Sequence, residues 1–384
     1  MNRYLTFLPD TSVDAKLEWG QCLEKMHGFR LTNYKLVRIS IFANMPDYQA
    51  YVLFIEEVKR SLTEKYGNSC PAFSVILDPP RKPLNITVEA RYMNDTAEDF
   101  VTKFNNSIPY VVRESDSAKE IWAGGMGAGL FPADTRKASQ AAFDQMREIL
   151  ETENMSYDHI VRQWNFIGNI LEIKNDLQNY QVFNEVRSEN YLKFRKMHSY
   201  PAATGIGAKH GGVTIDFYAV EPRRCLKIIA IDNPDQIRPY DYSQQVLRGK
   251  PLQGKDTKQP PQFERAVFVA DRDSYTLYVS GTASIIGQAT IGIDDIEKQT
   301  EVTLENIKKL TDANRIQHLT GNSQADAGKL ILLRAYIKYQ EDFLKVESIC
   351  NERFPGVPII YCETDVCRDN LLVEIEAEFS RNIK

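Results

Sequence analysis

The sequence VCRDNLLVEIEA, residues 366–377, decides how the last part of this chain folds. Apolar and acidic residues alternate from 373 to 377, which predicts a strand with Glu374 and Glu376 on the face opposite the apolar one. Cys367 stands seven residues before Glu374. A carboxylate on a rigid strand near a cysteine suits acid–base chemistry. The alternative is an edge strand whose charged face meets solvent.

Strand and helix patterns alternate around this stretch. Strands that pair around two helices predict an α+β fold, in which the helices pack on one face of a sheet. Alternation and amphipathic periodicity predict strands at 266–269, 275–280, 330–337, 357–361 and 371–379, and helices at 294–310 and 340–354.

Similar pieces recur earlier in the chain, which predicts internal repetition of one supersecondary unit. The copies span residues 48–92, 134–218 and 339–379, each with a helix followed by strands. Thr87 in the first copy stands where Glu374 stands in the last. If Glu374 is catalytic, the first copy is therefore structural.

Composition limits the classes of protein that fit. The chain has 384 residues, of which 43% are hydrophobic, enough for two or three cores. A net charge of −5 and the lack of dense Lys and Arg runs argue against a nucleic-acid partner. The first residues are too weakly apolar for a signal peptide, and no run of about 18 apolar residues predicts a membrane span. We expect a cytoplasmic protein.

The cysteines are scattered and predict neither a disulfide framework nor a metal site. Cys362 and Cys367 form the closest pair, with four residues between them and no second pair or histidine nearby. That spacing does not match a zinc site. We expect reduced thiols and no structural metal.

Two kinds of glycine-rich stretch call for different interpretations. The cluster at 124–129 fails the dinucleotide-binding fingerprint and lacks the ending of a phosphate loop, so it predicts a flexible turn before a helix. The stretches 201–208 and 280–284 are either tightly packed strands or places where a ligand approaches the backbone. In the first of these, Thr204 adds a hydroxyl donor.

Arginines near these elements are candidate ligand contacts. Arg334 lies within the apolar strand predicted at 330–337, so its guanidinium is either on a polar face or buried against an anion. Arg187 and Arg368 lie on or beside the other elements of interest. The segment 232–261 is rich in proline and predicts a long surface excursion before the last part of the chain.

Several motifs, taken in this order, resemble known families. The order of helices and strands and the ending LLVEIEA resemble the YjgF/RidA-like (chorismate-mutase-like) fold, and the combination of motifs is most similar to the chorismatases. The motifs cover roughly the last three-fifths of the chain and are RQWN at 162–165, FNEVR at 183–187, PAATGIG at 201–207, FERA at 263–266, SGTASI at 280–285 and CRxxLLVEIE at 367–376.

The resemblance implies an architecture. Relatives with the YjgF/RidA-like fold form trimers with sites between subunits, so three repeated modules with mixed sheets would build a pseudo-trimeric arrangement within one chain. We expect a monomer with its pocket between the middle and last modules. Residues 1–224 are expected to form an N-terminal domain of truncated, diverged modules, and residues 225–384 a C-terminal domain that carries the catalytic glutamate.

The resemblance also implies a reaction. Chorismatases remove pyruvate from chorismate, and their subtypes leave 3-hydroxybenzoate, a related hydroxybenzoate or a dihydroxycyclohexadiene carboxylate. Glu374 matches the general acid, and Cys367 with Gly281 resembles the subtype that yields 3-hydroxybenzoate. No metal, nucleotide or flavin is implied. Candidates for binding the substrate are Arg334, Arg187, Arg368, Thr204, Gly205, Gly207, Gly281 and Thr282.

Two other functions stay open at this point. An imine or enamine deaminase of the wider family would have an arginine fifteen residues before the glutamate, where this chain has Ile359. Without that arginine an imino-acid carboxylate loses its bidentate partner. The protein could also be a non-catalytic sensor of an aromatic acid. The roles of Cys367, in a later proton shift or in shaping the pocket, are not separated by the sequence.

Overall fold

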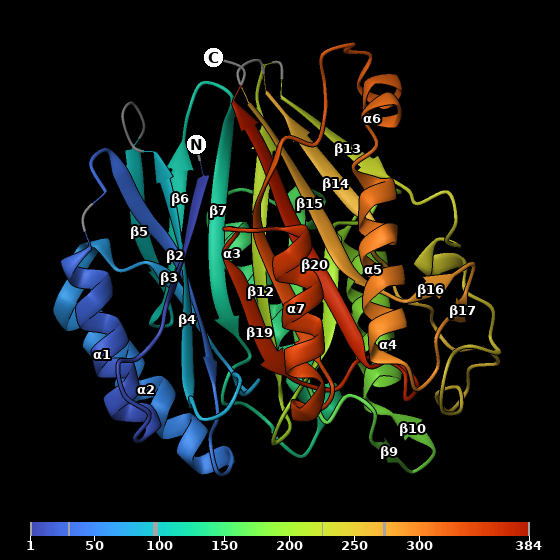
Figure 1. Cartoon of the computed structure of the whole chain (residues 1–384), viewed down its shortest axis with the longest axis horizontal. Coiled ribbons are helices and arrows are strands. Elements are labelled where there is room, and N and C mark those ends of the chain that lie inside the picture. The colour runs from blue at the N-terminus through green and yellow to red at the C-terminus, as the bar shows by residue number, and fades with distance from the viewer. Residues whose placement is uncertain (1, 30, 95–98, 225, 272–273, 383–384) are drawn as a thin grey trace.

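Three α/β units make up the computed structural model, which describes residues 2–29, 31–94, 99–224, 226–271 and 274–382 (Figure 1). The first unit has four strands in the order β1-β4-β2-β3. Its elements are β1 (Asn2–Phe7), α1 (Ala15–Gly28), β2 (Tyr34–Ala43), α2 (Tyr48–Tyr66), β3 (Ala72–Ile76) and β4 (Ile86–Asn94).

The second unit has a six-stranded sheet in the order β11-β8-β12-β7-β6-β5. The predicted turn before α3 covers residues 127–129, where Gly127 and Gly129 adopt positive φ angles, whereas Gly124 and Gly125 belong to β7. The elements are β5 (Asp99–Asn105), β6 (Ile108–Glu114), β7 (Ala118–Met126), α3 (Thr135–Thr152), β8 (Ile160–Gly168), α4 (Asn179–Phe194), β11 (Ala202–Ala208) and β12 (Val213–Pro222), with the short hairpin β9 (Ile173–Lys174) and β10 (Leu177–Gln178).

The third unit also has six strands, in the order β13-β14-β15-β20-β18-β19. Its elements are β13 (Lys227–Ile231), β14 (Ala266–Ala270), β15 (Ser274–Ala283), α5 (Ile296–Leu310), α6 (Ala313–Thr320), β18 (Lys329–Ile337), α7 (Phe343–Arg353), β19 (Ile359–Glu363) and β20 (Val373–Asn382), with the short hairpin β16 (Ile285–Ile286) and β17 (Ala289–Thr290).

The three units repeat one strand order, which confirms the predicted repetition. In each, a helix links two parallel strands: α2 between β2 and β3, α4 between β8 and β11, and α7 between β18 and β19. The strand that follows, β4, β12 or β20, then pairs antiparallel with the first of the two. The sheets are therefore mixed, and the expected α+β class is confirmed.

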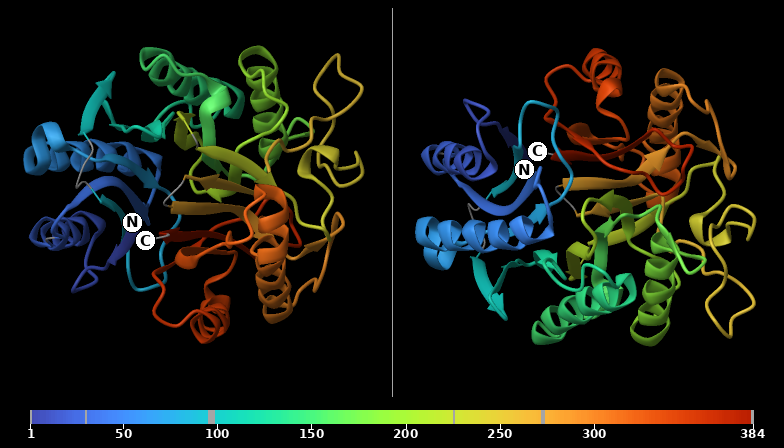
Figure 2. Two further views of the ribbon diagram at one scale, coloured as in Figure 1. Left: turned by 90° about the horizontal axis from the view of Figure 1, so that it is seen from above. Right: turned by 90° about the horizontal axis from the view of Figure 1, so that it is seen from below.

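The sheets face one another in the middle of the molecule, and the helices lie on the outside (Figure 2). Each unit has its own core between sheet and helices. A fourth core lies between the sheets and includes Phe42, Trp164 and Tyr336, one from each unit. Since both faces of the sheets are covered, strands such as β2 are buried on both sides.

Three buried ion pairs, which we call the ion-pair ring, join the units at this centre. Each unit contributes one arginine, from β2, β8 or β18, and one carboxylate, from β4, β12 or β20. In each pair the two groups come from different units, so the three pairs connect the units in a closed cycle. The pairs are Arg38–Asp216, Arg162–Glu376 and Arg334–Glu89, each with an N–O distance of 2.6 Å.

Two further features concern the helices and the cysteines. No helix in the described ranges is both long and apolar enough to cross a membrane. Five cysteines are free thiols, namely Cys22, Cys70, Cys350, Cys362 and Cys367. Cys225 lies outside the described residues.

Candidate active site

Glu374 lies on β20, in the interior of the third sheet. Its register partners are Ala283 on β15 and Tyr336 on β18. Because β20 has a neighbour on each side, the edge-strand alternative is wrong. The side chain of Glu374 is buried and lines a pocket between the second and third units.

Gly281 leaves the space that Glu374 occupies. The register of β15 shifts between Val279 and Thr282, and Gly281 lies at this irregularity. A Cβ atom at residue 281 would lie 1.9 Å from Oε1 of Glu374. Glycine at this position is therefore required by the glutamate, which gives one physical reason why the two residues occur together.

The surroundings of Glu374 favour its protonated form. Burial and the negative charge of Glu376 raise the pKa of Glu374 to about 8, although Arg162 and Arg265 act in the opposite direction. A hydrogen-bond donor would stabilise the ionised carboxylate, but among the described residues no group donates a hydrogen bond to Glu374. At neutral pH Glu374 is thus a carboxylic acid that faces a cavity, as a general acid must be.

Three arginines from different segments line the same pocket. Arg265 is buried; its Nη2 donates to Ile237 O at 2.8 Å and to Tyr242 Oη at 2.7 Å. Arg368 donates to Gln288 O at 2.7 Å and lies over the Tyr242 ring. Arg248 reaches Asp369 at 3.2 Å and is half exposed. Together they make the pocket suitable for an anion with more than one carboxylate.

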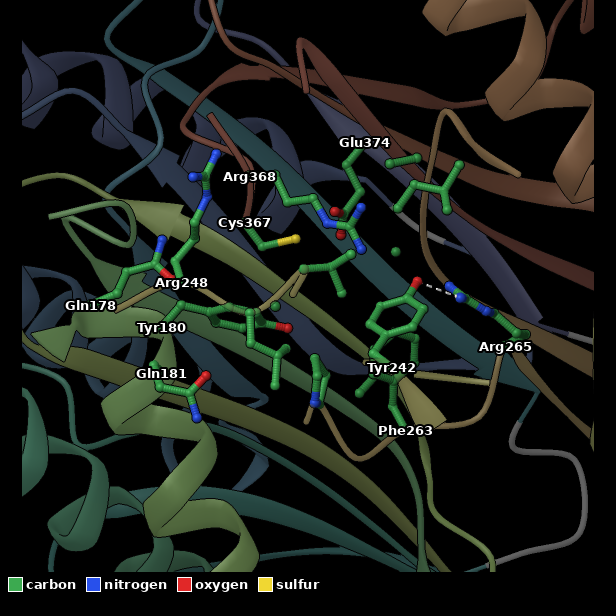
Figure 3. A pocket seen from close by; sticks show the side chains of 18 residues that line it. Gln178, Tyr180, Gln181, Tyr242, Arg248, Phe263, Arg265, Cys367, Arg368 and Glu374 are labelled. Carbon is green, nitrogen blue, oxygen red and sulfur yellow. Dashed lines mark hydrogen bonds between the residues drawn. The ribbon is translucent and has the colours of Figure 1, made fainter. Parts of the chain in front are cut away.

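Aromatic side chains form much of the remaining wall. Figure 3 shows Glu374, Cys367 and Arg368 entering from one side of the pocket, with Tyr180 and Tyr242 opposite. Gly205 allows Tyr180 to approach, because a Cβ atom there would lie 3.2 Å from its ring. A flat, partly unsaturated ring fits between such side chains.

Cys367 lines the pocket as a neutral thiol. Burial, with the nearby Glu374, raises the pKa of Cys367 to about 12. The thiolate is the form that acts as a base or nucleophile, so this cysteine at neutral pH contributes shape and a weak donor.

A segment without strands or α-helices, residues 243–259, covers the pocket and contributes Val246, Leu247 and Arg248 to its lining. It is held to α4 through the buried Glu185, which accepts from Lys255 Nζ at 2.7 Å and from the amide of residue 259 at 2.9 Å. The predicted surface excursion is therefore also part of the site.

Comparison with known proteins identifies the family of the chain. A family model described as "Chorismatase FkbO/Hyg5-like, N-terminal" matches residues 120–219. The chain is 33% identical over 258 residues to a 3-hydroxybenzoate synthase of Streptomyces hygroscopicus, covering 65% of this chain and 72% of that protein. The chain belongs to the chorismatase family.

Other chorismatase relatives match over similar lengths. A chorismatase of Streptomyces rapamycinicus is 33% identical over 231 residues, which cover 58% of this chain and 64% of the relative, just under two thirds of its length. A chorismatase crystal structure matches 99% of this chain and 98% of its own, with a TM-score of 0.68 at 19% identity, which shows a shared fold. A Rid-family protein of Yersinia pestis matches 31% of this chain, at a TM-score of only 0.24.

The strands and loops bring together five of the residues predicted for the chorismatase site, namely Glu374, Cys367, Arg368, Gly205 and Gly281. Arg334 is not in the pocket lining. Its guanidinium is buried in the ion-pair ring, where Glu89 accepts at 2.6 and 2.7 Å and Glu376 at 2.8 Å. The expectation that Arg334 is buried against an anion is confirmed, but the anions are the protein's own carboxylates.

The other predicted contacts are also placed away from the lining. Arg187 is buried and donates to Asn184 at 2.7 Å. The hydroxyl of Thr204 donates to Glu376 and accepts from Arg162, so it has no proton left for a substrate. Thr282 donates to the carbonyl of Ser280 at 2.8 Å.

Gly207 serves packing. A Cβ atom there would lie 2.7 Å from Asp365 O, and its own amide donates to that oxygen. This is the tightly packed interpretation of the 201–208 stretch, whereas Gly205, two residues earlier, borders the pocket. Both alternatives for this stretch therefore hold, at different residues.

Sequence reasoning missed several lining residues. Arg265 lies in the FERA motif that carried the resemblance, but it received no role. Arg248 and Tyr242 lie in the proline-rich segment, whose sequence has no periodicity to indicate what it covers. Tyr180 begins α4, and only the fold shows that this helix start meets the third unit.

Proposed function

We propose that this protein cleaves the enolpyruvyl ether of chorismate, releasing pyruvate and leaving 3-hydroxybenzoate. The observation that carries the proposal is geometric: the buried carboxyl of Glu374 faces a pocket lined by three arginines, and burial raises its pKa. Family membership and the relative named 3-hydroxybenzoate synthase give the substrate and product.

In the proposed reaction, Glu374 gives its proton to the terminal carbon of the enolpyruvyl vinyl group. The carbon becomes a methyl group, and an oxocarbenium ion forms at the ether carbon. General acid catalysis of this kind contributes about 10²–10⁴-fold. The arginines bind the two carboxylates and hold the vinyl carbon near the acid.

The cation is then captured either by the neighbouring ring hydroxyl or by water. In the first route the hydroxyl oxygen attacks the ring carbon that bears the ether, and the bond from that carbon to the ether oxygen breaks, so that pyruvate leaves and an epoxide remains on the ring. The epoxide then opens with its oxygen kept on the former ether carbon; that carbon loses its proton and the oxygen takes up one, which gives 3-hydroxybenzoate. That route consumes no water, and the ring proton can restore Glu374. Capture by water gives a dihydroxycyclohexadiene carboxylate instead. The neutral Cys367 and the covering segment support the first route, because both help to exclude water.

The test is direct. Purified protein is incubated with chorismate, and pyruvate and aromatic acids are followed by chromatography. We expect equal amounts of pyruvate and 3-hydroxybenzoate without added metal or cofactor. Tight binding of chorismate with no product would indicate a sensor. Hydrolysis of 2-aminoacrylate with no action on chorismate would indicate a deaminase. Ile359, which stands where such a deaminase would have its arginine, is not in the pocket lining.

We infer further that the three units stand about an internal pseudo-threefold axis and that the chain is a monomer. The closed cycle of the ion-pair ring supports this arrangement. A stable trimer in light scattering would contradict it. A division into domains at 224/225 is supported by the end of the second sheet at Pro222 and the start of the third at Lys227, and it stays a prediction, as does a cytoplasmic location.

A further inference from the structure

Two glutamates on one face of β20 have opposite surroundings. Glu376 accepts hydrogen bonds from four donors: Trp164 Nε1 at 2.8 Å, Arg334 Nη1 at 2.8 Å, Arg162 Nη2 at 2.6 Å and the Thr204 hydroxyl. A carboxylate has about four lone-pair sites, so these donors fill it and leave no place for a proton. Although burial acts in the other direction, Arg162 and Arg334 lower the pKa of Glu376 overall.

Glu374 stands two residues earlier on the same face, a distance of about 7 Å along a strand. It has no hydrogen-bond donor among the described residues, and its carboxyl faces the pocket. Between the two positions there is little water to screen a charge, because both side chains are buried. A fixed negative charge at Glu376 therefore disfavours a second one at Glu374.

We propose that Glu376 is a positioning residue, whose fixed charge keeps Glu374 protonated for catalysis. This inference rests on the proposed role of Glu374 as the acid. Glu376 does not reach the pocket, so it acts on the reaction only through Glu374.

The charges around Glu374 support the direction of the effect. Arg162, on β8, faces it but is paired with Glu376, and Arg265 faces it from the pocket wall. Cys367 and Tyr180, from the loop before β20 and from α4, have raised pKa values because of burial and are neutral. Removing the charge of Glu376 would leave Arg162 without its partner, and both changes favour ionisation of Glu374.

Thr204 links this pair to the pocket wall. Its hydroxyl oxygen accepts from the amide of Gly281 at 3.1 Å while its proton goes to Glu376. The hydroxyl of Thr204 thus holds the backbone of Gly281, where the strand irregularity makes room for Glu374, and it also binds the carboxylate of Glu376. Position and protonation of the acid are set by one connected network.

The ion-pair ring provides matched controls. Asp216 and Glu89 occupy the same place in the ring as Glu376, and each lies two residues after a threonine, Thr214 and Thr87, in place of an acid. Asp216→Asn thus removes a ring carboxylate with no acid beside it. Loss of the ring pair alone should lower the unfolding temperature in both variants.

The experiment compares Glu376→Gln with Asp216→Asn. The pH dependence of kcat on chorismate is measured, together with the titration of Glu374 by infrared difference spectroscopy, identified by subtracting spectra of Glu374→Gln. In Glu376→Gln we expect the basic limb of the profile, and the carboxyl titration, to move down by about one pH unit or more. Turnover at acidic pH should approach that of the unchanged protein. In Asp216→Asn the limb should not move.

Several outcomes would overturn the proposal. One is a Glu376→Gln enzyme that is slower by the same factor at every pH, and another is an equal shift in both variants. If Glu376→Gln does not fold, infrared titration of the unchanged protein tests the proposal. Glu374 must then titrate near pH 8, and Glu376 must stay ionised over the whole pH range measured. If chorismate is not turned over, the proposed function fails, while the infrared titration still tests the electrostatic link.

Discussion

The cleft between the second and third units and the cleft between the first and second units are built alike but differ in content. Each cleft is lined by glycines and by a tyrosine from the start of a helix, and a ring carboxylate lies on the strand beside it, outside the lining. In the cleft between the second and third units, Glu374 stands two residues before the ring carboxylate Glu376. In the cleft between the first and second units, Thr214 stands two residues before the ring carboxylate Asp216. The hydroxyl oxygen of Thr214 lies 3.4 Å from Tyr51 Oη, and Tyr48 lines the same cleft.

This difference shows how one scaffold position separates chemistry from structure. The ring carboxylates, Glu376 and Asp216, stabilise contacts between units in both clefts. The residue two positions earlier, Glu374 or Thr214, is not part of the ion-pair ring. Where this position holds an acid and the cleft is open, the site can protonate a substrate, and where it holds threonine, tyrosines fill the space.

The largest expected effect comes from removing the acid. Glu374→Gln should lower kcat by about 10²–10⁴-fold, because the amide cannot give a proton to carbon. The unfolding temperature should not fall, since the amide needs no charge in a buried place. As the matched change in the other cleft, Thr214→Val should leave turnover within about twofold. Retained activity in Glu374→Gln would exclude it as the acid.

The next effect tests the space beside the acid. Gly281→Ala places a Cβ atom 1.9 Å from Oε1 of Glu374, so the carboxyl must move. A misplacement of about 1 Å can lower turnover about 10²-fold, and kcat should fall by at least about tenfold.

Gly124→Ala is the control at the corresponding register irregularity between β7 and β12, where the new Cβ atom would lie 2.9 Å from the carbonyl oxygen of Phe73. It should lower the unfolding temperature without changing kcat. An equal loss of kcat in both variants would show that Gly281 acts only through stability.

A smaller effect concerns stability and pH. Burial and Glu376 raise the pKa of Glu374 from 4.5 to about 8 in the folded state. Folding therefore takes up a proton between these values, and this contribution to the free energy of unfolding is present below pH 4.5 and is lost as pH rises through 8. Between pH 6 and 9, the unfolding temperature should fall more for the unchanged protein than for Glu374→Gln, as measured by calorimetry. Parallel curves would contradict the raised pKa.

The smallest effect on rate is expected at Cys367. Cys367→Ala should change kcat by less than about fivefold at neutral pH, because the thiol is neutral there and cannot act as a base. The ratio of 3-hydroxybenzoate to the dihydroxycyclohexadiene product, measured by chromatography, should shift toward the latter, since a smaller side chain admits water. Cys362→Ala, in a buried place outside the pocket lining, is the control and should not change the ratio. A large loss of kcat with an unchanged ratio would assign Cys367 to proton transfer.

Much of the fold was predictable because the helices and several strands have clear periodicity. The strands β18 and β20 and the helices α5 and α7 lie close to their predicted ranges. The strand β2 was not predicted. It is buried on both faces and carries Arg38 and Ser40 inside, and its alternation of apolar and polar residues covers only residues 37–41 of ten.

The site was predictable where short sequence motifs contain its residues, and not where the site depends on contacts between units. Glu374, Cys367 and Gly281 follow from local motifs. Arg334 was misplaced because a buried arginine in a strand gives no indication of which anion it contacts, and its partner Glu89 is 245 residues away. Arg248 and Tyr242 reach the pocket only through the path of an irregular segment, which periodicity does not encode.

The ion-pair ring has a consequence for how the chain is made. Arg38 meets Asp216 only after 178 further residues have left the ribosome, and Glu89 meets Arg334 only after 245. A cation or anion buried without its partner is strongly destabilising, so the early units cannot settle into their final packing alone. Such long-range closure slows folding, and it delays the final packing of the first unit until the third unit has been made.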